Sequence, residues 1–211
     1  HMEQELANKL SAFIQENKGK RKFTQSVELA VNFMGVDFSK QDNRLNLEVK
    51  LPKGKGKQLK VMIFTDDVNI AEKAKSSGAT VVPGTEIQNI ANDKAKLTEI
   101  LQYEMLAQPN LMPTVARFLG QFLGPRNKMP KPLLGSDPIR AISDTANSIY
   151  LRSKGKYLPT VHCMIGMENM EASQLEANID EVLASLYKKV GKQNVKSVYV
   201  KLTMSKPLKL M

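Results

Sequence analysis

Alternating apolar and polar residues recur near both ends of this 211-residue chain, and this pattern constrains its fold most strongly. Such alternation is typical of a half-buried β-strand, because successive side chains of a strand point to opposite faces. Two segments of this kind lie in residues 1–60 and two more lie in residues 152–211. The four segments are 27–33, 45–51, 161–165 and 198–202. We therefore expect four similar strands, two from each end of the chain.

Each end also contains one segment whose apolar residues have helical spacing. The apolar positions are Leu6, Leu10, Phe13 and Ile14 in the first segment and Leu175, Ile179, Val182, Leu183 and Leu186 in the second. Ser173 and Glu176 are predicted to form a capping box for the second helix. Two helices on one face of a four-stranded, largely antiparallel sheet make a two-layer structure. The other face of the sheet is expected to be polar and partly wet.

The middle of the chain has a different pattern. The continuous apolar run at 61–64 predicts a strand covered on both faces, and shorter runs at 79–82 and 103–107 predict two more strands. Helical patterns lie between or after these runs, at 67–77, 85–101, 111–123 and 138–149. Strands that alternate with helices predict a small parallel α/β domain.

Together these patterns predict an α/β protein with a discontinuous domain. Residues 1–60 and 152–211 are expected to form an α+β, two-layer sheet–helix domain. Residues 61–151 are expected to form an inserted, three-layer, Rossmann-like α/β domain. The chain crossings are expected near the Gly- and Lys-rich segments 54–57 and 153–156, which should be flexible and well solvated.

The excess of positive over negative charge is confined to the two ends of the chain. The whole chain has 31 basic and 21 acidic residues, a net charge of +10. Residues 1–60 contain 12 basic and 7 acidic side chains, residues 152–211 contain 10 and 5, and residues 61–151 contain 9 of each. Such an excess favours a polyanionic partner, because neutralising phosphates releases condensed counterions. Charge alone does not distinguish a nucleic acid from an anionic membrane surface.

Several classes of protein are disfavoured by what the sequence contains. A single cysteine, Cys163, cannot form an internal disulfide, and two histidines do not provide a zinc-type cluster, so we expect a reducing intracellular compartment. No apolar run approaches the roughly 20 residues that span a bilayer. The Gly–Lys segment 53–57 lacks the spacing of a nucleotide-binding phosphate loop. We expect no enzyme activity, no cofactor, no metal and no membrane partner, and we interpret His1 as an expression remnant.

Two basic segments are candidates for nucleic-acid contact. Residues 18–22 contain four cations and are followed by Phe23, which offers a stacking surface beside phosphate contacts. Thr24, Gln25 and Ser26 add hydrogen-bonding groups at the start of a strand. The second segment, 123–132, contains Gly124 and three prolines, so a stiff loop would display its cations. Its cations, predicted to make a secondary RNA contact, are Arg126, Lys128 and Lys131.

These segments together resemble the L-one family of large-subunit ribosomal proteins, in an archaeal form, over essentially the whole chain after residue 1. The most specific segment is Leu123-Gly124-Pro125-Arg126 with Met129-Pro130 and Pro132. Further matches are Lys22-Phe23 before Ser26-Val27-Glu28, Asn43-Arg44, Leu51-Pro52 with Gly54 and Gly56, His162 with Ile165-Gly166, and Ser197-Val198 to Thr203-Met204.

The resemblance implies a structural protein of the cytoplasmic ribosome, whose interrupted domain binds large-subunit rRNA at the mobile stalk. It implies contact with exit-site tRNA, because the stalk moves as deacylated tRNA leaves. It also implies repression of the protein's own mRNA through a similar RNA structure. Away from the ribosome the protein is expected to be a monomer.

The resemblance also implies which residues contact RNA. They are Lys22, Phe23, Thr24, Ser26, Glu28, Arg44, His162, Gly166, Thr203 and Met204. The carboxylate of Glu28 would accept from a base amino group or a ribose hydroxyl, and Thr203 with Met204 would face the RNA minor groove. The family has glycine after the Thr–Met pair, whereas this chain has Ser205, whose Cβ would hold RNA further away or whose hydroxyl would add a bond.

Two other functions remain open from the residues alone. A small-molecule-binding or enzymatic α/β protein with a basic accessory domain would need a pocket with convergent polar groups within residues 61–151. A general single-strand binder would need stacking platforms, and an aromatic content of 6% with no Trp argues against them.

Overall fold

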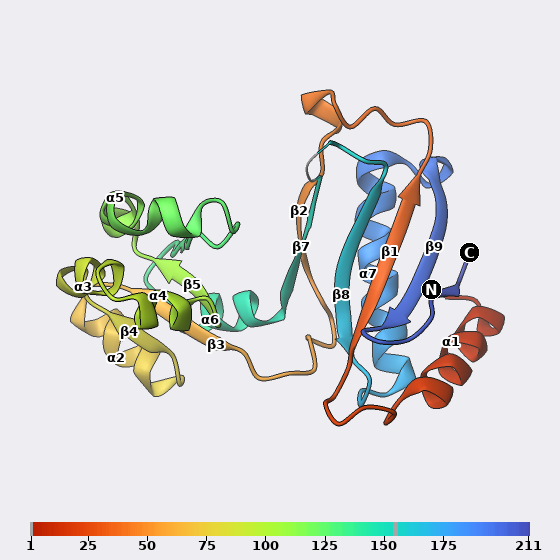
Figure 1. Cartoon of the computed structure of the whole chain (residues 1–211), viewed down its shortest axis with the longest axis horizontal. Helices are drawn as coiled ribbons and strands as arrows, with labels where there is room; N and C mark the ends of the chain where they lie inside the picture. The colour runs from red at the N-terminus through yellow and green to blue at the C-terminus, as the bar shows by residue number, and fades with distance from the viewer. Residues whose placement is uncertain (1, 154–155) are drawn as a thin grey trace. The chain divides into compact units, whose positions relative to one another are not determined.

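A computed structural model describes residues 2–153 and 156–211, and the chain forms two compact units (Figure 1). The terminal unit comprises His1–Lys57 and Asn147–Met211, and the inserted unit comprises Gln58–Ala146. Both junctions lie a few residues before the predicted boundaries at 60/61 and 151/152. Of the predicted second crossing at 153–156, Lys154 and Gly155 lie outside the described residues.

The terminal unit contains a four-stranded antiparallel sheet in the order β10–β9–β1–β8. Its strands are β1 (Ser26–Phe33), β8 (Thr160–Met167), β9 (Val195–Leu202) and β10 (Leu208–Lys209). The alternation predicted for β1 is present, because every second residue from Val27 to Phe33 is buried and those between are half-buried. The strand therefore has one face toward the core and one toward the open side of the sheet.

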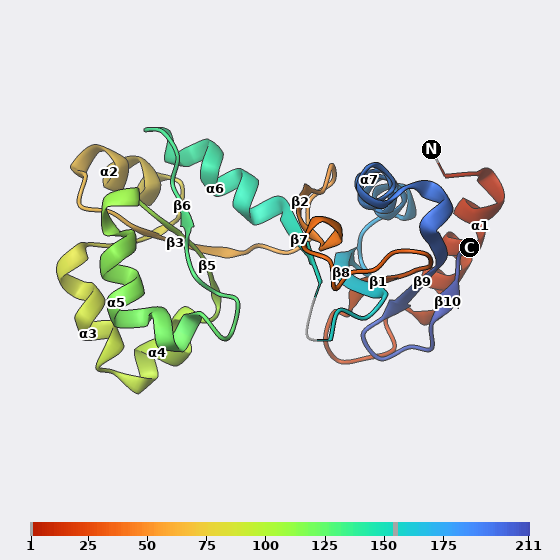
Figure 2. The ribbon, with the colours of Figure 1, turned by 90° about the horizontal axis from the view of Figure 1, so that it is seen from above.

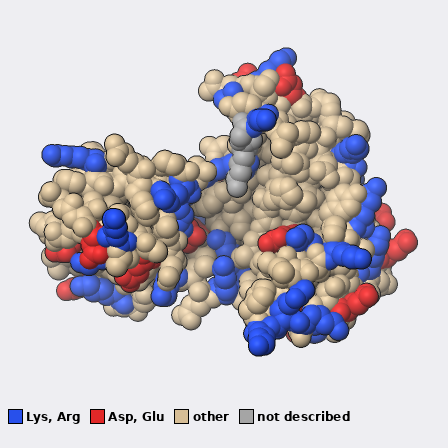
Figure 3. Space-filling model, viewed as in Figure 1, with Lys and Arg blue, Asp and Glu red and all other residues tan. Residues whose placement is uncertain are grey.

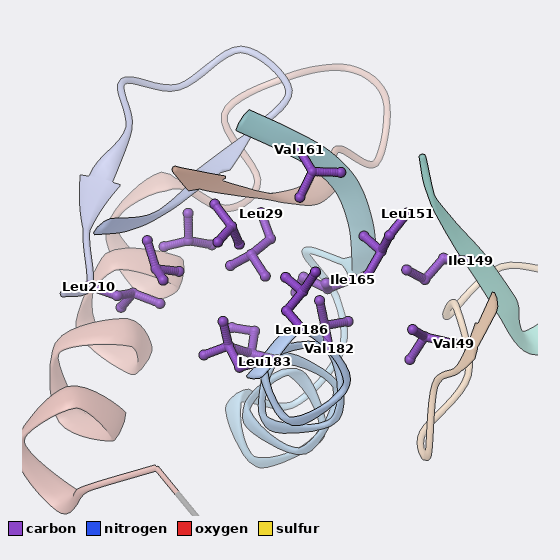
Figure 4. Packing of buried hydrophobic residues seen from close by; sticks show 14 of the residues in the cluster. Leu29, Val49, Ile149, Leu151, Val161, Ile165, Val182, Leu183, Leu186 and Leu210 are labelled. Atoms are coloured by element: carbon purple, nitrogen blue, oxygen red, sulfur yellow. The ribbon is translucent and has the colours of Figure 1, made fainter. Parts of the chain in front are cut away.

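Two helices, α1 (Gln4–Asn17) and α7 (Ala172–Val190), pack with this sheet. Leu183 and Leu186 of α7 point toward the buried side chains of the strands, such as Leu29 (Figure 4). The predicted capping box at Ser173 and Glu176 is wrong. The helix begins two residues earlier, so Glu171 is the N-cap and its partner is Gln174. Burial, with the nearby charge of Asp180, raises the pKa of Glu176.

The strand predicted at 45–51 does not join the four-stranded sheet. It is β2 (Asn46–Lys50), which pairs with β7 (Ser148–Arg152) in a separate two-stranded sheet. Both edges of β1 are already occupied by β8 and β9, and β10 covers the outer edge of β9. The side chains of Val49, Ile149 and Leu151 still enter the core of the terminal unit (Figure 4). A domain boundary after residue 151 would therefore remove β7 from this core.

The inserted unit contains a parallel sheet in the order β4–β3–β5–β6, which confirms the predicted α/β class. Its strands are β3 (Lys60–Phe64), β4 (Thr80–Val82), β5 (Tyr103–Ala107) and β6 (Lys131–Pro132). Residues 61–64 of β3 are all buried, as expected for a strand covered on both faces.

Helices cover both faces of the parallel sheet (Figure 2). The helices are α2 (Val68–Ser76), α3 (Ile87–Ala91), α4 (Lys94–Ile100), α5 (Met112–Leu123) and α6 (Pro138–Asn147). Phe64 packs with α3, α4 and α5 on one face, whereas Ile63 packs with α2 and α6 on the other. The single helix predicted at 85–101 is two helices, because Asp93 interrupts it and caps α4 through the N–H groups of Ala95 and Lys96. The inserted unit therefore has three layers, with the parallel sheet between two layers of helices.

Candidate nucleic-acid interface

Predicted contact residues from opposite ends of the chain meet at one end of the terminal sheet. Ser26 begins β1, and Thr203 directly follows β9. The two strands are antiparallel with Val27 opposite Leu202, so the start of β1 lies beside the end of β9. The segment 22–28 and the turn 203–205 therefore form one surface, which we call the contact end.

Hydroxyl and carboxylate groups form a short network at the contact end. The backbone N–H of Ser26 donates to Oγ1 of Thr203 over 3.1 Å, and the two hydroxyl oxygens are 2.9 Å apart. The Ser26 hydroxyl also donates to Oε1 of Glu28 over 3.3 Å. All three side chains are half-buried, so they are positioned by the protein and still reachable from outside. Such oriented polar groups can read a base edge or a ribose hydroxyl.

Two large apolar side chains are exposed beside this network. Phe23 is 51% exposed and Met204 is 55% exposed. An aromatic ring exposed next to cations is suited to stacking on a base, and an exposed thioether is suited to packing on a sugar or base face. Lys18, Lys20, Arg21 and Lys22 lie in the loop before Phe23 and are exposed. Figure 3 shows Lys and Arg side chains gathered over this loop at the lower edge of the terminal unit.

Two buried polar residues support the contact end, and sequence analysis did not identify their role. Gln25 and Glu168 are only 2% and 6% exposed. The carboxylate of Glu168 accepts from the backbone N–H of Gly19 and from both the backbone and side-chain nitrogens of Gln25. Oε1 of Gln25 accepts from the backbone N–H of Met204 over 2.9 Å. The only available signal was that Gln25 occupies an apolar position in the alternation of β1.

The open face of the sheet carries the next predicted residues. Glu28 lies between Met164 of β8 and Lys201 of β9. His162 is exposed on the same face, opposite Ala30. Both side chains therefore point away from the core, along the strands that lead to the contact end.

Gly166 is placed differently, because it is buried. A Cβ at this position would lie 2.6 Å from Cδ2 of Leu175 and 2.8 Å from Sδ of Met170. Close packing with α7 and the turn before it therefore requires glycine here, independently of any RNA contact.

Ser205 forms part of the turn that follows β9. Its hydroxyl accepts from the backbone N–H of Leu202 over 2.9 Å, and its own N–H donates to the carbonyl of Leu202. The only positive φ angles recorded for non-glycine residues in the described chain are at Asn127 and Tyr157. The serine therefore fits this turn without a left-handed backbone and uses its hydroxyl to close it.

Arg44 does not lie at the contact end. It directly follows a short 3-10 helix (Gln41–Asn43), and its guanidinium lies 4.3 Å from the ring centroid of Tyr157. Its Nη2 donates to the carbonyl of Ser39 over 3.0 Å. Tyr157 precedes β8, whose first residues pair with the end of β1, so Arg44 is separated from Ser26 by the length of β1. The structure thus places Arg44 at the opposite end of the sheet.

The cations predicted as a secondary contact interact with their own unit. The guanidinium of Arg126 lies 4.1 Å from the Phe122 ring centroid and donates to the Phe122 carbonyl over 2.7 Å. The ammonium of Lys128 donates to the carbonyl of Tyr103 over 2.9 Å and lies 3.9 Å from Oε1 of Glu104. Lys131 is half-buried in β6. Lys128 therefore holds the loop against β5, whereas Arg126 is exposed and contacts Phe122, four residues before it in the chain.

Two other kinds of site are absent from residues 2–153 and 156–211. No helix there is long and apolar enough to cross a membrane. No group of three or more His, Cys, Asp or Glu side chains in the same residues is arranged to hold a metal ion. Burial raises the pKa of the lone thiol, Cys163, to about 12, so it is protonated at neutral pH and acts as a packing group.

Comparisons with known proteins cover both units. A sequence model described as the ribosomal protein L1p/L10e family matches residues 12–206. The chain is 41% identical over 196 residues to a large ribosomal subunit protein uL1 of Thermofilum pendens, covering 90% of this chain and 86% of the relative. It is 37% identical to the uL1 of Thermococcus kodakarensis, covering 96% of each, and 36% identical to that of Thermoplasma acidophilum, covering 93% and 92%.

Proposed function

The chain belongs to the ribosomal protein L1p/L10e family, and on this premise we propose that it binds large-subunit rRNA through the contact end of its terminal unit. The members of this family are structural proteins rather than enzymes. In this proposal the protein is a component of the cytoplasmic large ribosomal subunit and attaches at the mobile stalk.

The observation that supports the proposal most directly is the composition of the contact end. Exposed Phe23 and Met204 flank a hydroxyl–carboxylate network that joins Ser26, Thr203 and Glu28. Sequence-specific RNA recognition uses stacking surfaces together with oriented donors and acceptors for base edges and 2′-hydroxyls. A non-specific polyanion binder would need the cations alone.

Charge and recognition have separate sources in this surface. Lys20, Arg21 and Lys22 are exposed in the loop before Phe23 and supply phosphate attraction, which is weakened by salt. The carboxylate of Glu28 repels phosphates, so it would contribute to specificity and not to general affinity. It would do so by accepting hydrogen bonds from groups that only some RNA structures present. The affinity should therefore depend on both salt concentration and RNA structure.

Two finer functions extend this proposal, and the resemblance to the family supports both. We propose that it also binds a similar structure in the protein's own mRNA, so that free protein represses its own translation. On the ribosome, the protein would move with the stalk and assist the release of deacylated tRNA from the exit site. Competition between rRNA and mRNA fragments for one protein molecule would test whether a single surface serves both RNAs.

A binding titration tests the main proposal. The full chain should bind a stalk rRNA fragment at fixed salt about 10³-fold or more tightly than an RNA of equal length and scrambled sequence. Equal affinity for the two RNAs would contradict specific recognition. We favour this function over the alternative of a small-molecule-binding protein because the family match spans both units.

A further inference from the structure

We propose that Glu168 and Gln25 are positioning residues that hold the two separate halves of the contact end in register for RNA. This inference rests on the proposed function of that surface. Neither side chain is placed to touch RNA, since both are buried. We call the pair and its hydrogen bonds the register lock.

The first half of the register lock fixes the basic loop. Oε2 of Glu168 accepts from the backbone N–H of Gly19 over 3.2 Å, and Oε1 accepts from the backbone N–H of Gln25 over 3.0 Å. These two donors lie at either end of the segment that carries Lys20, Arg21, Lys22 and Phe23. One carboxylate therefore draws both ends of the loop to the same point, which restricts where the exposed cations and ring can go.

The second half extends the lock to the opposite end of the chain. The amide of Gln25 donates through Nε2 to Glu168 over 3.3 Å and accepts through Oε1 from the backbone N–H of Met204 over 2.9 Å. The carbonyl of Gln25 also accepts from the backbone N–H of Glu168 over 2.9 Å. The side chain of Gln25 thus bridges Glu168, which follows β8, and the turn that follows β9. Gln25 thus connects the segment that carries Phe23 to the backbone of Met204.

The energetics favour a positioning role over a purely stabilising one. A carboxylate buried to this extent loses hydration, and the loss is tolerable only when its oxygens are hydrogen-bonded, as they are here by three N–H donors. Apolar side chains in such places often give equal or greater stability. The polar pair instead fixes the position and orientation of particular backbone N–H groups, those of Gly19, Gln25 and Met204. A surface ordered before binding avoids the entropic cost of ordering its loops during binding.

The test uses the full chain and compares E168Q, Q25E and the double variant E168Q/Q25E. In E168Q an NH₂ group replaces one acceptor oxygen and faces N–H donors, and in Q25E two carboxylates face each other. The double variant restores one amide and one carboxylate. Each single variant should bind the stalk rRNA fragment about tenfold or more weakly at fixed salt, and the double variant should recover part of that loss.

A matched control separates positioning from general loss of stability. Asn178 is a fully buried polar residue of the same unit, and its amide donates to the carbonyls of Gly54 and Ile165. Asn178→Leu should lower the melting temperature and leave the affinity of the folded protein within about twofold of wild type. Hydrogen exchange should accelerate at the amides of Gly19 and Met204 in the single variants and not in the control.

The outcomes distinguish this inference from the proposed function. If wild type prefers the rRNA fragment, and E168Q exchanges rapidly at Gly19 and Met204 yet binds as wild type does, the register lock is wrong. The same conclusion follows if the control loses as much affinity as E168Q. If wild type shows no preference between the rRNA fragment and its scrambled form, the proposed function fails, and so does the positioning role. Should E168Q not fold, Gln25→Leu, which removes only the bridge, supplies the same comparison.

Discussion

Both units of the protein display a basic loop, but the loops differ in what their cations contact. In the terminal unit, Lys20, Arg21 and Lys22 are exposed and stand beside the exposed ring of Phe23. In the inserted unit, the guanidinium of Arg126 covers Phe122, and Lys128 is held by Tyr103 and Glu104. The difference shows that a cation in a loop can serve the protein's own packing instead of a partner.

The two units also differ in how their loops are supported. The terminal loop is tied by the register lock to a turn that comes from the other end of the chain. The loop of the inserted unit is held by neighbouring elements of the same unit, including the carbonyl at the end of α5. We infer that the terminal loop is built to present groups outward and that the loop of the inserted unit is built mainly to close its own fold.

The largest predicted effect comes from separating the units. A chain in which a short linker joins Lys57 to Asn147 retains β7, and its affinity for the stalk rRNA fragment should stay within about tenfold of the full chain. The isolated segment 58–146 should bind more weakly by about 10³-fold or more, as non-specific complexes do. Both affinities are measured by titration at one salt concentration. Comparable affinity of the two pieces would remove the distinction between the units.

The boundary at 146/147 is essential to this experiment. Joining residue 60 to residue 152 would delete β7 and with it the buried side chains of Ile149 and Leu151. Removing two such side chains costs several kcal/mol of stability, at about 2–5 kcal/mol for each large-to-small change. We therefore expect that shorter version to unfold at a markedly lower temperature, measured by circular dichroism.

The next effect concerns a single hydroxyl at the contact end. Thr203→Ala removes the hydroxyl that accepts from the backbone N–H of Ser26 and shares a hydrogen bond with the Ser26 hydroxyl, and it should weaken specific RNA binding by about 1–3 kcal/mol. Thr160→Ala is the matched control, because Thr160 bonds to the carbonyl of Val31 at the other end of the same sheet. An unchanged affinity in Thr203→Ala would exclude this residue from the site.

A somewhat smaller effect is expected from the exposed ring. Phe23→Ala should cost about 1–2 kcal/mol of binding, near the lower part of the range for one base stacked on an aromatic side chain. Ile139 of the inserted unit is similarly exposed, at 52% against 51% for Phe23, so Ile139→Ala provides the comparison. The two variants should have similar melting temperatures. Equal loss of affinity in both would mean that exposure alone, and not position, governs the contact.

The smallest effect distinguishes available cations from occupied ones. Lys22→Gln should lower the slope of log affinity against log salt concentration by about one. Lys128→Gln should leave that slope unchanged and lower the melting temperature, because it removes contacts with Tyr103 and Glu104. A reversed pattern, with the slope changing only in Lys128→Gln, would assign the phosphate contact to the inserted unit.

Periodicity predicted the elements of this fold better than it predicted their pairing. The alternation at 45–51 correctly indicates a strand, but alternation does not specify a partner, and β2 pairs with β7. Strand β7 was not predicted from the sequence, because the helical pattern at 138–149 continues into Ser148 and Ile149, where the chain changes from α6 to β7. Local propensity does not predict this change from helix to strand, because it depends on pairing with the distant strand β2.

For the candidate site too, the sequence predicted individual residues better than it predicted which of them lie together. Phe23 was predicted from its position beside four cations and Thr203 from the family resemblance, and antiparallel pairing of β1 with β9 brings their segments together. The resemblance also predicted Arg44 as an RNA contact. Its side chain lies at the other end of the sheet, packed on Tyr157. Gln25 and Glu168 are 143 positions apart, so no local pattern connects them. Hydrogen bonds between distant segments become visible only once the fold has placed those segments side by side.

Ultraviolet crosslinking of the full chain to a stalk rRNA fragment, with the crosslinked peptides identified by mass spectrometry, tests the central claim most directly. The account predicts crosslinks concentrated in the peptides that carry Phe23 and Met204, and their loss when unlabelled fragment competes. Crosslinks concentrated within residues 58–146, with none at the contact end, would contradict it.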